Sequence, residues 1–137
     1  MYPRSTIKVW PAHDAYDYEY LGAGLADRRL LDDSVAIQVF RAPLLAVPVG
    51  GRRRGGYFIV SGLSNARAVC DVLRGRPGFL LPRQRWAPAP DSYYVVEWGE
   101  RGPRGDADTR ARFYGYAEEA IVTGRVQLPP LPPDPFS

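Results

Sequence analysis

This sequence of 137 residues has one cysteine, one histidine and one methionine, and only one of its 18 basic residues is a lysine. The lone Cys70 excludes a disulfide within the chain, which is typical of a reducing compartment, so we expect a buried thiol and a cytoplasmic protein. His13, Asp14, Asp17 and Glu19 lie close together in the sequence, but a zinc or iron site commonly needs a second histidine. We therefore expect neither a metal nor a cofactor.

Long apolar runs and the common enzyme motifs are also missing. No run is long enough to cross a bilayer, and the initial stretch MYPRSTIKVW lacks the apolar region of a signal peptide, so we expect no membrane contact. The chain has no Walker-type loop, no Gly-x-Gly-x-x-Gly turn after a strand and no nucleophile elbow. An enzyme is therefore less expected than a binding protein.

The overall composition is that of a globular domain, with 45% hydrophobic and 24% charged residues. We predict one α+β domain over residues 1–126, built from a small mixed sheet and two or three helices. Residues 127–137 are proline-rich and predict an extended tail.

Local patterns predict most of the elements. Apolar alternation and β-branched content predict strands or extended segments at residues 5–10, 14–22, 43–49, 57–60 and 92–98, with a short edge strand at 79–81. Apolar spacing predicts helices over 25–40 and from Ser61 or Ser64 to Arg74. Residues 109–124 are compatible with a helix or with a hairpin. The expected core includes Leu44, Val47, Phe58, Val60, Val69, Leu73, Val95 and Trp98.

Charge is distributed unevenly along the chain. Residues 41–90 contain nine arginines and one acidic residue, a net charge of +8, whereas residues 1–40 carry −2 and residues 91–137 carry −3, which together give the +3 of the whole chain. A strongly basic segment attracts phosphate, nucleic acid or an acidic protein.

Within that segment, Arg52, Arg53 and Arg54 lie between glycine pairs in the stretch GGRRRGG. Glycines favour a tight turn, so we expect the exposed tip of a hairpin, with a solvated loop of no binding role as the alternative. Further candidates for contact with an anionic partner are Arg67, Arg74, Arg76, Arg83, Arg85 and Trp86. Arginine beside tryptophan is typical of surfaces that neutralise phosphates and stack on bases.

The stretch PLLAV, the later YFIVSG and the pair Arg67-Ala68 resemble the central part of the ParB/sulfiredoxin-like domain, over residues 31–74. The resemblance implies a phosphate-binding turn at the start of a helix, formed by Ser61, Gly62, Ser64 and Asn65. A helix N-terminus offers unpaired N–H groups and partial positive charge to a phosphate. An ordinary helix cap is the alternative interpretation of these residues.

The turn departs from the family pattern. Members that bind nucleotide carry an acidic residue and two arginines directly after the turn glycine, where this chain has Leu63, Ser64 and Asn65. The sulfiredoxin branch requires a cysteine in this turn, which this chain lacks. With no carboxylate to act as acid or base, catalysis on a phosphate ester is disfavoured, and no catalytic residue is assigned.

Two functional hypotheses follow. The first is a non-catalytic binding protein of bacterial or mobile-element origin whose basic central surface engages nucleic acid. The second is a small phage- or plasmid-type inhibitor or adaptor that binds an acidic protein through the arginine cluster or the proline-rich tail. The sequence leaves the oligomeric state and the choice between DNA and RNA open.

Overall fold

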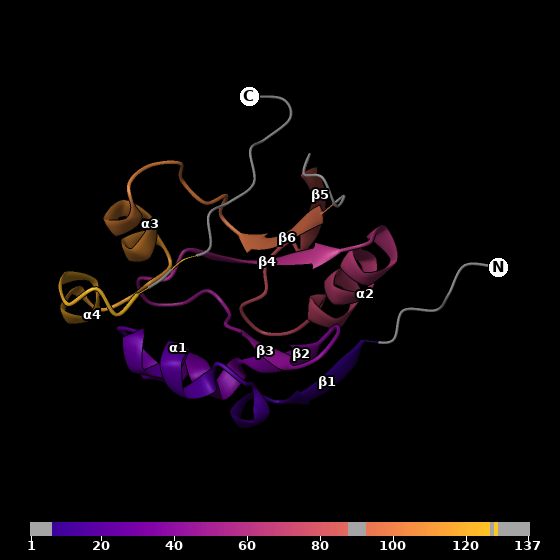
Figure 1. Ribbon diagram of the computed structural model, residues 1–137, viewed down its shortest axis with the longest axis horizontal. Coiled ribbons are helices and arrows are strands. Elements are labelled where there is room, and N and C mark those ends of the chain that lie inside the picture. The colour runs from indigo at the N-terminus through magenta and orange to yellow at the C-terminus, as the bar shows by residue number, and fades with distance from the viewer. Residues whose placement is uncertain (1–6, 88–92, 127, 129–137) are drawn as a thin grey trace.

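Two three-stranded antiparallel sheets, flanked by short helices, make up residues 7–87, 93–126 and 128, which are the residues that the computed structural model describes (Figure 1). The strands are β1 (Lys8–Pro11), β2 (Val35–Gln38), β3 (Pro43–Ala46), β4 (Gly55–Ser61), β5 (Arg83–Ala87) and β6 (Tyr93–Gly99). The helices are α1 (Tyr18–Gly24), α2 (Leu63–Leu73), α3 (Ala107–Phe113) and α4 (Glu118–Val122), with two 3-10 helices, η1 (Ala12–Asp14) and η2 (Arg28–Asp33).

The predicted α+β class in one small domain is confirmed, although the strands form two antiparallel sheets instead of one mixed sheet. Their orders are β1-β2-β3 and β4-β6-β5, so β3 and β4 are each the edge of a sheet. Figure 1 shows the sheets as two layers, with α2 on one side and α3 and α4 on the other. The predicted boundary at residue 126 stays a prediction, because residues 127 and 129–137 lie outside the described residues.

The main core fills the space between the two sheets. Val35 and Ile37 project from one face of β2, opposite Val60 of β4 and Trp98 of β6. Helix α2 closes this core with a buried stripe at the helical spacing expected from its sequence: Ala66, Val69, Cys70 and Leu73. The predictions of this helix and of a buried Cys70 are confirmed.

A second core lies on the opposite face of β2 and β3. Ala36 and Leu45 point to this side, because side chains alternate along a strand. They pack against Tyr114, Tyr116 and Ile121 from the α3–α4 region. Tyr57 of β4 packs against the same cluster, so the α3–α4 region contacts residues of both sheets.

Four predicted segments differ from the structure. Residues 25–40 form η2 and β2 instead of one helix, because β1 and β3 pair with both edges of VAIQ. The alternating tyrosines of residues 14–22 lie in η1 and α1, not in a strand, and the edge strand after α2 is β5 instead of 79–81. Residues 109–124 contain parts of two short helices separated at Gly115, which has φ 78°, so neither the continuous helix nor the hairpin forms.

Most of the predicted core is buried. The buried members are Val47, Val60, Val69, Leu73, Val95 and Trp98. Phe58 is half-buried, and Leu44 is 44% exposed, so its place in the core was predicted wrongly. None of the helices in the described ranges is long and apolar enough to cross a membrane.

The contact between Gly56 and Trp98 gives a test of this packing. A Cβ atom at Gly56 would overlap the indole of Trp98, which is buried between the sheets and held by a hydrogen bond from its Nε1 to the Val47 carbonyl. We expect Gly56→Ala to lower the free energy of unfolding by about 1–3 kcal/mol, the usual cost of overpacking. Chemical denaturation measures this loss. Gly105→Ala is the control, because a Cβ there comes no closer than 3.9 Å to another residue's atoms; equal stability of the two variants would contradict the packing described.

Candidate functional site

The three consecutive arginines have three different environments. Arg52 is exposed, and Arg54 is exposed but forms an ion pair with Glu100 at 2.7 Å between Nε and Oε2. Arg53 is buried, with only 9% of its surface exposed. Gly50 and Arg53 exchange two backbone hydrogen bonds of 3.0 and 2.9 Å, which close a tight turn. The tight turn was therefore predicted correctly. The hairpin was predicted wrongly, because β3 and β4 before and after the turn belong to different sheets, and so was the exposed position of Arg53.

The guanidinium of Arg53 is held by backbone carbonyls and tyrosines. Nε donates to the Val47 carbonyl at 3.2 Å, and Nη1 donates to the Tyr114 carbonyl at 2.9 Å. The Tyr114 ring centroid lies 5.8 Å from Cζ, and the Tyr116 hydroxyl also hydrogen-bonds the guanidinium. No ion pair joins Arg53 to a carboxylate in the described part of the chain, and burial lowers its pKa.

Gly115 explains how a chain segment can pack so closely over this arginine. A Cβ atom at Gly115 would lie 2.6 Å from the Arg53 Cβ, and its φ of 78° is a conformation that side chains rarely adopt. Glycine at this position therefore brings the carbonyl of Tyr114 and the hydroxyl of Tyr116 to the guanidinium.

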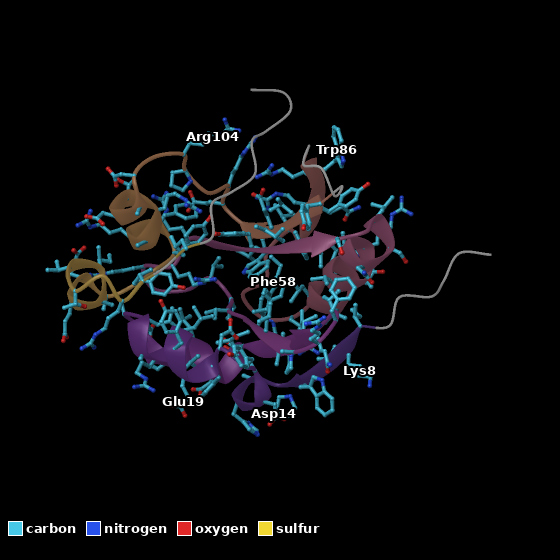
Figure 2. All side chains as sticks on the ribbon, viewed as in Figure 1. Lys8, Asp14, Glu19, Phe58, Trp86 and Arg104 are labelled. Atoms are coloured by element: carbon cyan, nitrogen blue, oxygen red, sulfur yellow. The ribbon has the colours of Figure 1, made fainter. Side chains whose placement is uncertain are left out.

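Arg53 lines a cavity of about 890 Å³ that lies beside the main core. Its apolar walls come from the edge strands of the two sheets, including Leu44 of β3 and residues 57–60 of β4. The exposure of Leu44 follows from this position. Figure 2 shows the labelled Phe58, another lining residue, between the two sheets.

Three tyrosines surround the polar end of the cavity. The rings of Tyr57 and Tyr114 are 5.2 Å apart, and the Tyr57 hydroxyl accepts a hydrogen bond from Arg110 Nη2 at 3.2 Å. Burial raises the pKa of Tyr57, Tyr114 and Tyr116 above the ordinary value for a phenol. All three hydroxyls are therefore neutral at pH 7 and able to donate hydrogen bonds.

Asp17 is the one acidic residue among the described residues that line the cavity, where the basic residues are Arg53 and the exposed Arg41. Its Oδ1 accepts a hydrogen bond from the Leu45 backbone N–H at 2.8 Å, on the free edge of β3. Desolvation by burial raises the pKa of this carboxyl despite that hydrogen bond. We refer to Asp17, Arg53, Tyr57, Tyr114 and Tyr116 as the Arg53 cluster.

Most of the other predicted basic residues are already engaged within the chain. Arg83 and Arg85 both form ion pairs with Glu97, which is buried beneath them on β6. Arg74 pairs with Asp71 at 2.7 Å along α2. Glu97 and Glu100 are thus the two carboxylates from outside residues 41–90 that pair with this segment in the described part of the chain, and they offset only a small part of its net charge of +8.

The remaining predicted residues lie at the surface. Arg67 is exposed on α2, and Arg76 is exposed just beyond it, where its Nε donates to the Val72 carbonyl at 3.0 Å. Trp86 lies half-exposed on the edge strand β5 and points outward in Figure 2. These side chains do not line the cavity.

The predicted phosphate-binding turn is assembled at the start of α2. Gly62 occupies the N-cap position with φ 88°, and Asn65 Nδ2 donates to the Ser61 carbonyl at 3.0 Å. Ser64 is exposed in the first turn of the helix. This local bonding suits an ordinary cap, and phosphate binding here stays a prediction.

Sequence reasoning missed the cavity because its polar residues are far apart along the chain. The only signal for Tyr114 and Tyr116 is the aromatic stretch FYGY, which contains the glycine that packs on Arg53. Asp17 was considered only as a metal ligand. The described residues contain no group of three or more His, Cys, Asp or Glu side chains that could hold a metal ion.

A family model matches residues 9–136, so the chain belongs to DUF6302, a family of unknown function. No curated protein and no solved structure matches the chain. Neither result tests the resemblance to the ParB/sulfiredoxin-like domain, which stays a prediction.

The different environments of Arg52 and Arg53 predict different costs of truncation. Arg53→Ala removes the donors to two buried carbonyls, so we expect it to lower the free energy of unfolding by more than about 2 kcal/mol. Arg52→Ala changes an exposed side chain and should stay within about 0.5 kcal/mol of the wild type. Urea denaturation of both variants measures the difference. Equal stabilities would show that Arg53 is exposed after all.

The raised pKa of Asp17 predicts a pH dependence. The unfolded carboxyl loses its proton near the ordinary pKa of 3.8, whereas the folded one keeps it to a higher pH. Stability therefore falls as pH rises through this window and stays lower above it. Asp17→Asn keeps an acceptor for Leu45 but no charge, so it should be at least as stable as the wild type at pH 7.

The stability advantage of Asp17→Asn over the wild type should disappear below about pH 4, where the wild-type carboxyl is also neutral. Chemical denaturation of the wild type and of Asp17→Asn, at pH 7 and below about pH 4, tests this expectation. Asp32→Asn replaces an exposed carboxylate and should leave stability within about 0.5 kcal/mol of the wild type. A large loss of stability in Asp17→Asn at pH 7 would mean that the ionised carboxylate holds β3.

Proposed function

We propose that this DUF6302 protein is a binding protein that takes up a small, largely apolar carboxylate in the cavity, with Arg53 as its counter-ion. One observation carries the proposal: a buried guanidinium, which forms no ion pair with any carboxylate among the described residues, lines an otherwise mainly apolar cavity. We also propose a cytoplasmic location, because the single cysteine permits no disulfide within the chain.

The energetics of charge burial support an anionic ligand. Burial of an ion without a counter-ion costs several kcal/mol, and carbonyl and ring contacts offset only part of this cost. A guanidinium has five N–H donors, and Arg53 directs three of its hydrogen bonds to Val47, Tyr114 and Tyr116. The remaining donors have no acceptor in the described part of the chain, and a carboxylate accepts two N–H bonds at once.

The size and lining of the cavity support a small molecule. At about 890 Å³, the cavity lies within the range of roughly 300–1,000 Å³ that is typical of ligand pockets. Leu44, Phe58 and Ile59 supply apolar surface for the body of the ligand. The neutral Tyr116 hydroxyl, which contacts the guanidinium, adds a hydrogen-bond donor for a carboxylate oxygen.

Binding of nucleic acid or of an acidic protein at the basic surface remains the prediction of the sequence. The geometry supports it less than the cavity, because Arg54, Arg74, Arg83 and Arg85 form internal ion pairs. The side chains left for such a partner, among them Arg52, Arg67 and Arg76, belong to different segments of the chain.

A matched pair of ligands tests the proposal on the wild-type protein. Naphthylpropanoate and its neutral amide have the same shape and differ in charge. We expect the acid to bind at least about tenfold more tightly in isothermal titration calorimetry, because it gains charge-assisted hydrogen bonds from Arg53. Equal affinities, or no binding of either compound, would contradict the proposal.

A second pair of variants tests the place of binding. Leu44 and Leu80 are both exposed leucines, at 44% and 58%, but only Leu44 lines the cavity. Leu44→Trp should fill part of the cavity and weaken binding of naphthylpropanoate, whereas Leu80→Trp should leave its affinity unchanged. Unchanged affinity in Leu44→Trp together with weaker binding in Leu80→Trp would place the binding site outside this cavity.

A further inference from the structure

Asp17 is placed to cap α1 but does not do so. It occupies the N-cap position of that helix, where an aspartate usually accepts a hydrogen bond from the first turn, yet its side chain makes no such bond. The carboxylate instead turns to β3, where Oδ1 accepts from the Leu45 N–H. The carboxylate of Asp17 therefore points toward β3, which forms part of the cavity wall, and not toward the first turn of α1.

The carboxylate of Asp17 accepts few hydrogen bonds from the residues that the structure describes. The Leu45 N–H donates to Oδ1, and the Asp17 backbone N–H also bonds the carboxylate, so further lone pairs remain for a ligand. The residue is half-buried and lines the cavity. A partly desolvated carboxylate oxygen with an open lone pair favours a donor, above all a cationic one.

Asp17 and Arg53 lie at the same end of the cavity. Arg53 hydrogen-bonds the hydroxyl of Tyr116, and the charge of Asp17 acts on that same hydroxyl. The two charges are nevertheless not joined in an ion pair, so each is available to a ligand that reaches both. Tyr116, which also lines the cavity, is therefore near both charges.

We propose that the ligand carries a carboxylate and a protonated amine on one apolar body, as an apolar amino acid does. The carboxylate binds Arg53, the ammonium group binds the carboxylate of Asp17, and the apolar body lies against Leu44, Phe58 and Ile59. This inference rests on the proposed function, and it narrows the ligand from any apolar carboxylate to a zwitterion. A ligand of this kind neutralises both charges at once, so neither remains unpaired.

Titration calorimetry at pH 7 with three related compounds tests the inference: naphthylalanine, naphthylpropanoate and naphthylethylamine. The first carries both charges, and the others carry one each. We expect naphthylalanine to bind wild-type protein about tenfold more tightly than naphthylpropanoate, since one more charge-assisted hydrogen bond forms. Naphthylethylamine should bind most weakly, because it leaves Arg53 unpaired and brings a second cation near it.

The variant Asp17→Asn separates binding of the ammonium group by Asp17 from binding of the carboxylate by Arg53. It should remove the advantage of naphthylalanine, while naphthylpropanoate binds the variant as tightly as before or more tightly, because a negative charge has gone. Glu19→Gln is the matched control, since Glu19 is exposed on the same helix and points outward in Figure 2. The preference for naphthylalanine should persist in this control.

The outcomes distinguish the inference from the function on which it rests. If naphthylpropanoate binds as tightly as naphthylalanine while the neutral amide does not, Asp17 has no role in recognition and the carboxylate site stands. If the preference for naphthylalanine survives in Asp17→Asn, the ammonium group lies elsewhere and the inference is wrong. If none of the compounds binds, both proposals fail.

Discussion

Burial of one guanidinium without a carboxylate is the constraint on which the structure depends. Arg53 donates to the carbonyl of Val47, which follows β3, and to the carbonyl of Tyr114, which follows α3. The indole N–H of Trp98, from the other sheet, donates to that same Val47 carbonyl at 2.9 Å. A single oxygen thus connects both sheets to the arginine, and the α3–α4 link closes over it. Loss of this contact would therefore loosen three parts of the fold together.

In this protein, the burial of a charged side chain determines its energetic effect more than the number of charges does. Exposed pairs such as Arg54 with Glu100 contribute little to stability, because water and salt screen them. Arg53 is removed from solvent, so its interaction with a counter-ion is screened far less. For this reason the +8 of residues 41–90 is a weaker guide to function than the environment of one of its members.

Sequence patterns were informative where the local signal is strong. Helix α2 has apolar residues at helical spacing, and β4 and β6 contain short runs rich in aromatic and β-branched residues, so each could be predicted without knowledge of its neighbours. The stretch VAIQ fits two periods, and pairing with β1 and β3, both distant in the sequence, decides in favour of a strand. Nothing in the triplet of arginines distinguishes the buried one, because its burial depends on Gly115, far along the chain. The candidate site could not be predicted, since its charges come from such distant contacts.

The separation of Arg53 and Gly115 along the chain also affects binding. The polar end of the cavity exists only when Gly115 lies against Arg53, because Tyr114 and Tyr116 flank that glycine. A ligand that pairs with Arg53 therefore favours the state in which α3 and α4 are docked. By mass action, any molecule that binds the docked state alone stabilises it by RT ln(1 + [L]/Kd). Under the proposed function, affinity for a carboxylate ligand and docking of α3 and α4 are therefore coupled, with Arg53 as the physical link between them.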